Sequence, residues 1–80
     1  MSVKDAVAAR VRNLCKERGI RANELANISA VTASTVYSLL DERRRDVSVI
    51  TVKKLCDGLE MSLADFFAAP EFDALEQEIS

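Results

Sequence analysis

Residues 19–40 read GIRANELANISAVTASTVYSLL, and this stretch contains two short amphipathic segments separated by a very tight turn. Ile20 and Leu25 have the spacing of a hydrophobic staple around the start of the first segment, which predicts a helix over 22–29. Thr32 is a good N-cap for a second helix over 33–41, because its hydroxyl can accept from an orphan backbone amide. Only two residues separate the first helix from this cap. The stretch therefore predicts two short helices that meet at a fixed corner.

The N-terminal segment predicts a longer helix. Ser2 and Asp5 form an S-x-x-D capping box, and apolar residues then recur every three or four positions. Gly19 follows the last polar turn and suits the left-handed position that ends many helices. The expected helix spans 3–18.

The C-terminal half predicts further helices. Ser48 can cap a fourth helix, and Ser62 with Asp65 forms a second S-x-x-D box that opens a fifth. Pro70 is tolerated at the first helical position, so a short sixth helix can begin there. The expected apolar stripe of the fourth helix consists of Val49, Val52, Leu55, Cys56 and Leu59.

Length and composition agree with an all-helical domain. Eighty residues suffice for one domain, and 49% hydrophobic with 30% charged residues is typical of a globular chain. Two Gly and one Pro disfavour a turn-rich β fold. The prediction is all-α: a five-helix domain over 1–69, followed by an acidic C-terminal extension over 70–80 that has room for a short sixth helix.

Several classes of protein are excluded. The longest apolar runs have four residues, whereas a transmembrane helix needs about 20. We therefore expect no membrane association and a cytoplasmic location. Cys15 and Cys56 are expected to be reduced core residues, with a single disulfide or redox switch as the alternative. With no His and two Gly, the chain is not expected to be an enzyme or to bind a metal or a cofactor. No separate sensor domain follows residue 80, so no small-molecule ligand is expected.

Charge is divided unevenly along the chain. Residues 1–54 hold all 11 basic residues and 6 acidic ones, whereas residues 55–80 hold 7 acidic residues and no basic one. The two parts carry net charges of +5 and −7. This polarity indicates a basic face for an anionic partner and an acidic end held away from it. The alternative is an unevenly charged but merely solvated surface.

Residues 19–40 also resemble the helix-turn-helix core of lambda-repressor-like (Cro/repressor-type) regulators. The resemblance extends over roughly residues 5–67. The matching positions are Glu24-Leu25-Ala26, Val31-Thr32, Ser34-Thr35-Val36, Leu39, Ser48-Val49-Ile50-Thr51-Val52, Leu55-Cys56 and Ser62-Leu63-Ala64-Asp65-Phe66-Phe67.

The resemblance implies a sequence-specific regulator of transcription, a repressor, that binds double-stranded DNA with the 33–41 helix in the major groove. It also implies a homodimer on a palindromic operator. The residues it places at base edges are Ala33, Ser34, Tyr37 and Ser38. The residues it places at the DNA backbone are Thr32, Arg21, Arg43, Arg44 and Arg45.

Four residues depart from the family pattern. Arg21 replaces the usual Ser or Thr, and Ala22 replaces a Gln that commonly grips phosphate. Ala30 replaces a Gly, so it is expected to hold a positive φ angle at a cost of about 1 kcal/mol. Ala33 offers no hydrogen bond at a position often used to read bases. Specificity is therefore expected to depend on Tyr37, thymine-methyl contacts and DNA shape.

These departures keep a second function open. A helix-turn-helix scaffold with weak DNA binding can serve as a protein-interaction module, such as an antitoxin or an accessory subunit, with its acidic tail on the partner. Dimerisation is expected through the C-terminal end, although residues 70–79 can instead fold back over their own core. The candidate dimer contacts are Phe66, Phe67, Phe72, Leu75 and Ile79.

Overall fold

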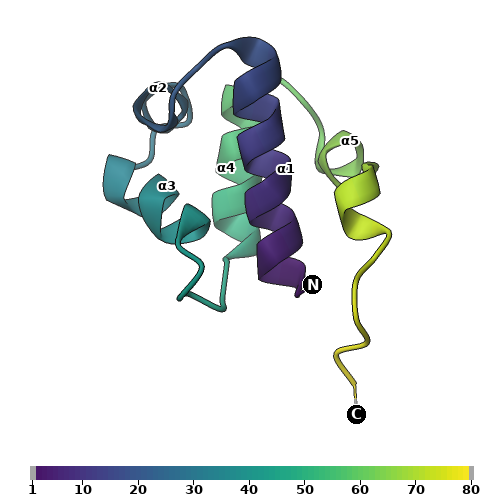
Figure 1. Cartoon of the computed structure of the whole chain (residues 1–80). Helices are drawn as coiled ribbons and strands as arrows, with labels where there is room; N and C mark the ends of the chain where they lie inside the picture. Colours follow the sequence, from purple (N-terminus) through teal and green to yellow (C-terminus); the bar gives the residue numbers. More distant parts are fainter. Residues whose placement is uncertain (1, 80) are drawn as a thin grey trace.

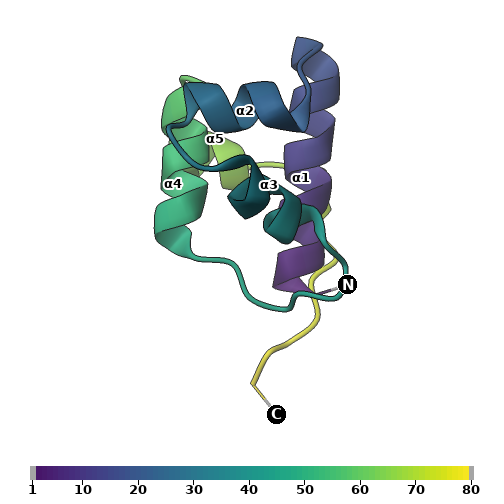
Figure 2. The same cartoon turned by 90° about the vertical axis from the view of Figure 1, so that its left-hand side faces the viewer.

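The computed structural model describes residues 2–79, and regular structure in that range is entirely helical. The elements are α1 (Val3–Arg18), α2 (Ala22–Ile28), α3 (Ala33–Leu40), α4 (Val49–Gly58), α5 (Leu63–Phe67) and a 3₁₀ turn, η1 (Pro70–Phe72). α2 and α3 lie on one side of α1 and α4, whereas α5 lies on the other side (Figure 1). Viewed from the side of α2 and α3, α2 crosses above α3 and α5 lies behind them (Figure 2). The predicted all-α, five-helix fold is confirmed.

The ends of α1 follow from local side-chain chemistry. The backbone N–H of Asp5 donates to Ser2 Oγ at 3.2 Å, and the Ser2 N–H donates to Asp5 Oδ2 at 3.2 Å, so the predicted capping box is present. Gly19 ends the helix at a φ of 65°, in the left-handed region that glycine enters without strain. The predicted bounds of this helix, 3–18, are confirmed.

The core is built from the inward faces of all five helices. Its members are Val7, Ala8, Val11, Leu14, Leu25, Ala26, Val36, Leu39, Val52, Leu55, Cys56, Leu59 and Phe66. Val49 is not among them: its side chain is 68% exposed, so its assignment to the α4 stripe was wrong. It is the first residue of α4, and the first buried position of that helix is Val52. Cys56 is buried and Cys15 half-buried, and both thiols are free in the described structure.

Basic side chains of α1 hydrogen-bond to the carbonyl ends of other helices. Arg10 donates from Nε to the carbonyl of Phe66 at 2.8 Å and from Nη2 to that of Asp65 at 3.0 Å, at the end of α5. Arg18 donates to the carbonyl of Leu59 at 2.5 Å, just after α4. The last carbonyls of a helix have no partner within it and carry partial negative charge. These arginines therefore stabilise the fold.

The C-terminal extension begins as a packed turn and then loses regular structure. Asn13 on α1 donates to Glu71 Oε2 at 2.8 Å, and Phe72 packs half-buried against the core. No helix continues through residues 73–79, so the short sixth helix that was expected to begin at Pro70 is limited to the 3₁₀ turn η1. A helix of this length is marginal in water, and Glu76 and Glu78 would lie toward the negative end of its dipole.

Two aromatic residues at this end differ in accessibility. Phe66 is completely buried in the chain's own core, so its assignment to a dimer surface was wrong. Phe67 is 41% exposed and packs its ring against that of Phe72, with centroids 4.9 Å apart. Nowhere in residues 2–79 is a helix long and apolar enough to cross a membrane.

Candidate nucleic-acid interface

The corner between α2 and α3 is held by buried apolar residues and by a strained turn. Leu25 and Ala26 of α2 and Val36 of α3 are at most 2% exposed. The N–H of Val31 donates to the carbonyl of Ala26 at 3.1 Å, which closes the turn. Ala30 has a φ of 55°, so the positive φ angle expected where the family has Gly is confirmed. The corner therefore fixes how α3 projects from the body.

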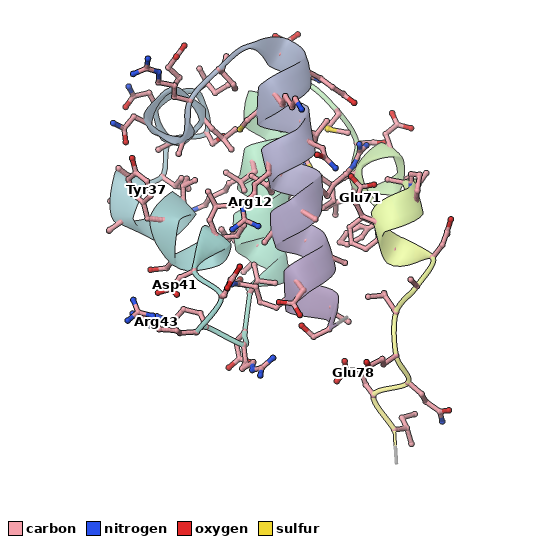
Figure 3. All side chains as sticks on the ribbon, viewed as in Figure 1. Arg12, Tyr37, Asp41, Arg43, Glu71 and Glu78 are labelled. Carbon is pink, nitrogen blue, oxygen red and sulfur yellow. The ribbon has the colours of Figure 1, made fainter. Side chains whose placement is uncertain are left out.

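The outer face of α3 presents the residues predicted to meet bases. Ala33, Ser34 and Tyr37 are exposed and Ser38 is half-buried, on adjacent turns of one face. Figure 3 shows Tyr37 on the side of the molecule away from α5. Thr35 is also half-buried, between this face and the core. The four predicted base-contact residues thus lie together on the surface.

Hydroxyl groups gather at the start of α3. Thr32 Oγ1 accepts from the Thr35 N–H at 3.2 Å, as expected of an N-cap. The same oxygen lies 3.0 Å from Ser34 Oγ and 2.8 Å from Thr35 Oγ1. This group of hydroxyls lies beside the positive end of the helix dipole, an arrangement suited to a phosphate oxygen.

A hydrogen bond between α2 and α3 was missed by sequence reasoning. The hydroxyl of Tyr37 donates to Asn23 Oδ1 at 3.2 Å, and both side chains are exposed. Asn23 lies in the first turn of α2, close to the family position at which Ala22 replaces Gln. The available signal was Asn23, a polar residue at the start of α2. Its partner lies fourteen positions away, and the two side chains meet only because of the angle between α2 and α3.

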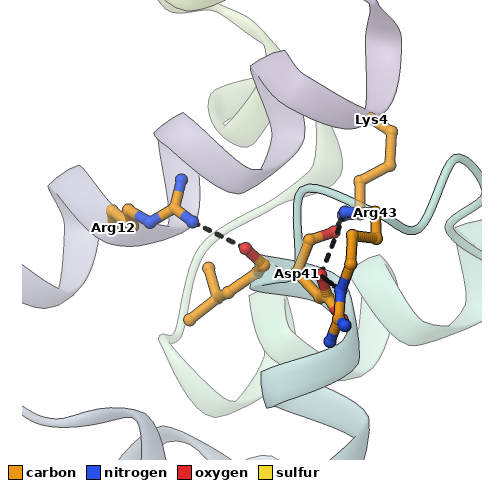
Figure 4. A network of polar contacts seen from close by, with 5 residues as sticks. Lys4, Arg12, Asp41 and Arg43 are labelled. Atoms are coloured by element: carbon orange, nitrogen blue, oxygen red, sulfur yellow. Dashed lines mark hydrogen bonds and ion pairs between the residues drawn. The ribbon is translucent and has the colours of Figure 1, made fainter.

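The end of α3 is tied to α1. Lys4, although only 3% exposed, donates from Nζ to the carbonyl of Asp41 at 2.6 Å, and Arg12 donates from Nη2 to that of Leu40 at 2.6 Å (Figure 4). Arg10 and Arg18 bond in the same way to the ends of α5 and α4. Four basic residues of α1 therefore stabilise the fold through hydrogen bonds to helix ends. Of these four side chains Lys4 is buried and Arg10 half-buried, whereas Arg12 and Arg18 stay exposed while they make these bonds.

The three consecutive arginines after α3 have different surroundings. Arg43 pairs with Asp41, its Nη2 lying 3.0 Å from Oδ2, while its side chain stays 89% exposed. The hydrogen bonds from the Arg43 side chain and backbone lower the pKa of Asp41 to about 2. Arg44 lines a groove shared with Ser34 and Ser38 of α3.

Arg45 points to another part of the surface. It lines a separate groove with residues of the α1 N-terminus and with Glu76 and Glu78 of the tail. The fifth predicted backbone contact, Arg21, is exposed at the N-cap of α2. Arg44 is therefore the loop arginine that shares a groove with the α3 face, a distinction that the sequence did not reveal.

An exposed helix braced by a second helix across a tight turn defines a helix-turn-helix protein. The chain belongs to the Cro/C1-type helix-turn-helix DNA-binding domain family, whose model matches residues 10–71. The lambda-repressor-like resemblance is confirmed.

One solved structure supports the fold separately. It is titled "Crystal structure of the prophage Lp1 protein 11" and is 24% identical to this chain, with a TM-score of 0.80. The match covers 94% of this chain and all of that one. At this identity the likeness is evidence for the fold alone. No curated protein sequence matches the chain.

Proposed function

We propose that this chain is a sequence-specific transcriptional regulator, a repressor, that acts in the cytoplasm by inserting α3 into the major groove of double-stranded DNA. The observation that carries the proposal is the outer face of α3, where exposed polar side chains stand on a helix braced by α2. A helix of this kind enters the major groove with its first turns against the base edges.

The proposed contacts fall into two groups. Base edges meet Ala33, Ser34, Tyr37 and Ser38. Phosphates meet Thr32, Arg21, Arg43, Arg44 and Arg45. Base contacts specify the sequence and phosphate contacts position the protein. Arg44 is the best supported of the loop arginines, because it lines a groove with two of the base-contact residues.

We further propose that the regulator binds a palindromic operator as a homodimer. A domain of 80 residues presents a single α3, and a two-fold dimer doubles the base contacts available to it. The exposed aromatic ring of Phe67, with Leu75 and Ile79 of the tail, is the proposed dimer surface.

A protein-interaction module is the second candidate. Two observations favour it: Ala33 and Ala22 supply no hydrogen bond to DNA, and four basic side chains of α1 are turned to helix ends rather than to a partner. In this case the acidic tail would contact a partner protein, as an antitoxin or accessory subunit does.

A selection from random duplexes, followed by gel shifts at two salt concentrations, separates the candidates. The regulator predicts one enriched motif, and its binding to nonspecific duplex should be weaker and should fall steeply with salt. Failure to bind any duplex at low salt would overturn DNA regulation and leave the interaction module. Binding without an enriched motif would overturn sequence specificity.

A further inference from the structure

The contact between Asn23 and Tyr37 determines which hydrogen-bonding role Tyr37 has left for a ligand. Tyr37 is 54% exposed on the outer face of α3, and its hydroxyl oxygen lies 3.2 Å from Asn23 Oδ1. A phenol has one hydrogen to donate, and its oxygen can also accept. Because the hydrogen is directed to the Asn23 carbonyl oxygen, the hydroxyl offers only lone pairs to an incoming group.

The other hydroxyls on this face are not restricted in the same way. Ser34 Oγ and Thr32 Oγ1 lie 3.0 Å apart, and either can be the donor. A serine hydroxyl that can rotate serves as donor or acceptor according to its partner. Among the predicted base-contact residues, only Tyr37 therefore presents a hydroxyl with a fixed polarity in the described structure.

The four bases differ in the exocyclic group, amino or keto, that each presents to the major groove. Adenine shows the N6 amino group and cytosine the N4 amino group, and both are donors. Thymine shows O4 and guanine shows O6, and both are acceptors. A side chain restricted to accepting can bond with adenine or cytosine, whereas it sets oxygen against oxygen at thymine or guanine.

We infer that Asn23 is a specificity-determining positioning residue, which holds the Tyr37 hydroxyl as an acceptor so that Tyr37 selects an amino-bearing base over a keto-bearing base on the strand it contacts. This inference rests on the proposed DNA-binding function. The carbonyl of Asn23 fixes the direction of the phenolic hydrogen, and Tyr37 makes the contact to the base.

The test uses the full chain and the motif enriched from random duplexes. Tyr37→Phe identifies the base pair that Tyr37 contacts, because this variant should lose its base preference at that one position of the motif. At that position the unmodified protein should favour adenine and cytosine over thymine and guanine by about three- to tenfold, the range of one net hydrogen bond. Asn23→Ala releases the phenolic hydrogen to donate to a keto oxygen. The preference for adenine and cytosine at this position should then be lost, whereas the preferences at the other positions of the motif should stay unchanged.

Two comparisons isolate the mechanism. In the Tyr37→Phe background, Asn23→Ala should produce no further change at that position, because the two residues act through one hydroxyl. Asn27→Ala, which removes an exposed amide from the same helix, is the matched control and should leave the preference intact. Melting curves check that each variant is folded.

The outcomes separate this inference from the function on which it rests. An enriched motif with a keto base at the Tyr37 position, no position sensitive to Tyr37→Phe, or an amino preference that survives Asn23→Ala, would overturn the inference while leaving the regulator intact. The absence of any enriched motif would instead overturn the proposed sequence-specific function.

Discussion

Arg43 lies across the carboxylate of Asp41, with Nε 3.1 Å from Oδ1 and Nη2 3.0 Å from Oδ2. The backbone N–H of Arg43 donates to the same Oδ1 at 2.9 Å. These bonds favour the charged carboxylate, so the pKa of Asp41 falls from its ordinary value of 3.8 to about 2. The pair holds Arg43 in the loop that follows α3, while leaving its side chain exposed.

The first prediction concerns acid stability. A lowered pKa in the folded state means that the contribution of Asp41 is present above pH 3.8 and is lost as the pH falls toward 2. Arg43→Ala removes the side-chain bonds but keeps the backbone bond, so the pKa of Asp41 should rise part of the way to 3.8. NMR titration of the Asp41 carboxyl carbon measures this. Arg44→Ala is the control, and an equal rise in both variants would contradict the assigned cause.

The second prediction concerns the arginine loop. Changing Arg43, Arg44 and Arg45 to Ala should weaken binding to every DNA sequence alike, and each lost phosphate contact should reduce the salt slope of log K by about 0.9. Arg44→Ala alone should account for one such step, because Arg44 shares the groove with the α3 face. Fluorescence anisotropy at several salt concentrations measures the slopes.

Lys54→Ala serves as the control for the loss of one positive charge. Lys54 lies in a groove with Ile28 and Gly58, and not in the groove that Arg44 shares with α3. Its removal should leave the slope nearly unchanged. A triple variant with an unaltered slope would remove the arginine loop from the interface.

The third prediction concerns the contact of α2 with α4. A Cβ added at Gly58 would lie 2.3 Å from Ser29 Oγ and 2.9 Å from the backbone oxygen of Ile28. Gly58→Ala should therefore destabilise the fold by about 1–3 kcal/mol, because the backbone must move. Ser29 Oγ is buried without a hydrogen-bond partner in the described structure, so Ser29→Ala should have little effect or stabilise slightly. Urea unfolding measures both, and a harmless Gly58→Ala would refute this close packing.

Local signals in the sequence determined most of the helix boundaries. The Ser2 box, the Thr32 cap and Gly19 each act within a few residues, and each end lies where it was predicted. The positive φ angle of Ala30 was foreseen from the family resemblance, because the family has Gly at this position of the turn. Such features depend on neighbouring residues and need no knowledge of the tertiary structure.

Features that depend on distant residues were missed. Arg10, Arg12 and Lys4 were counted as part of a basic face, yet they bond to the ends of helices 28 to 56 positions away. A charge count does not show which basic side chains bond to a carbonyl of another helix. The Asn23–Tyr37 bond was missed for the same reason, because its partners meet only once α2 and α3 have packed.

The fourth prediction concerns the turn before α3. Ala30 has a φ of 55°, where a Cβ is strained, so Ala30→Gly should raise the free energy of unfolding by about 1 kcal/mol. Binding to DNA should be unchanged, since the backbone already adopts the conformation that glycine prefers. Ala64→Gly in α5 is the control and should destabilise, because glycine is a poor helix former. A lower stability of Ala30→Gly would contradict the assigned strain.

The last prediction concerns the dimer surface. Removing all of residues 70–80 would also remove Phe72 and Glu71, which pack on the body of the same chain. A chain ending at Asp73 keeps both and lacks Leu75 and Ile79, of which Ile79 is 79% exposed. If the tail forms the proposed interface, the full chain should sediment as a dimer at concentrations where the shortened chain is a monomer.

Phe67→Ser tests the aromatic part of the same surface without shortening the chain. Phe67 is 41% exposed, so the substitution should leave the chain folded, with a melting curve still cooperative. It should nevertheless weaken self-association. Ile50→Ser is the matched control: Ile50 is 69% exposed at the start of α4, next to the 68% exposed Val49. A dimer that survives both the shortened chain and Phe67→Ser but dissociates in Ile50→Ser would move the interface to α4. Because α4 begins beside the groove lined by Arg44, that result would also place the two-fold axis close to the DNA.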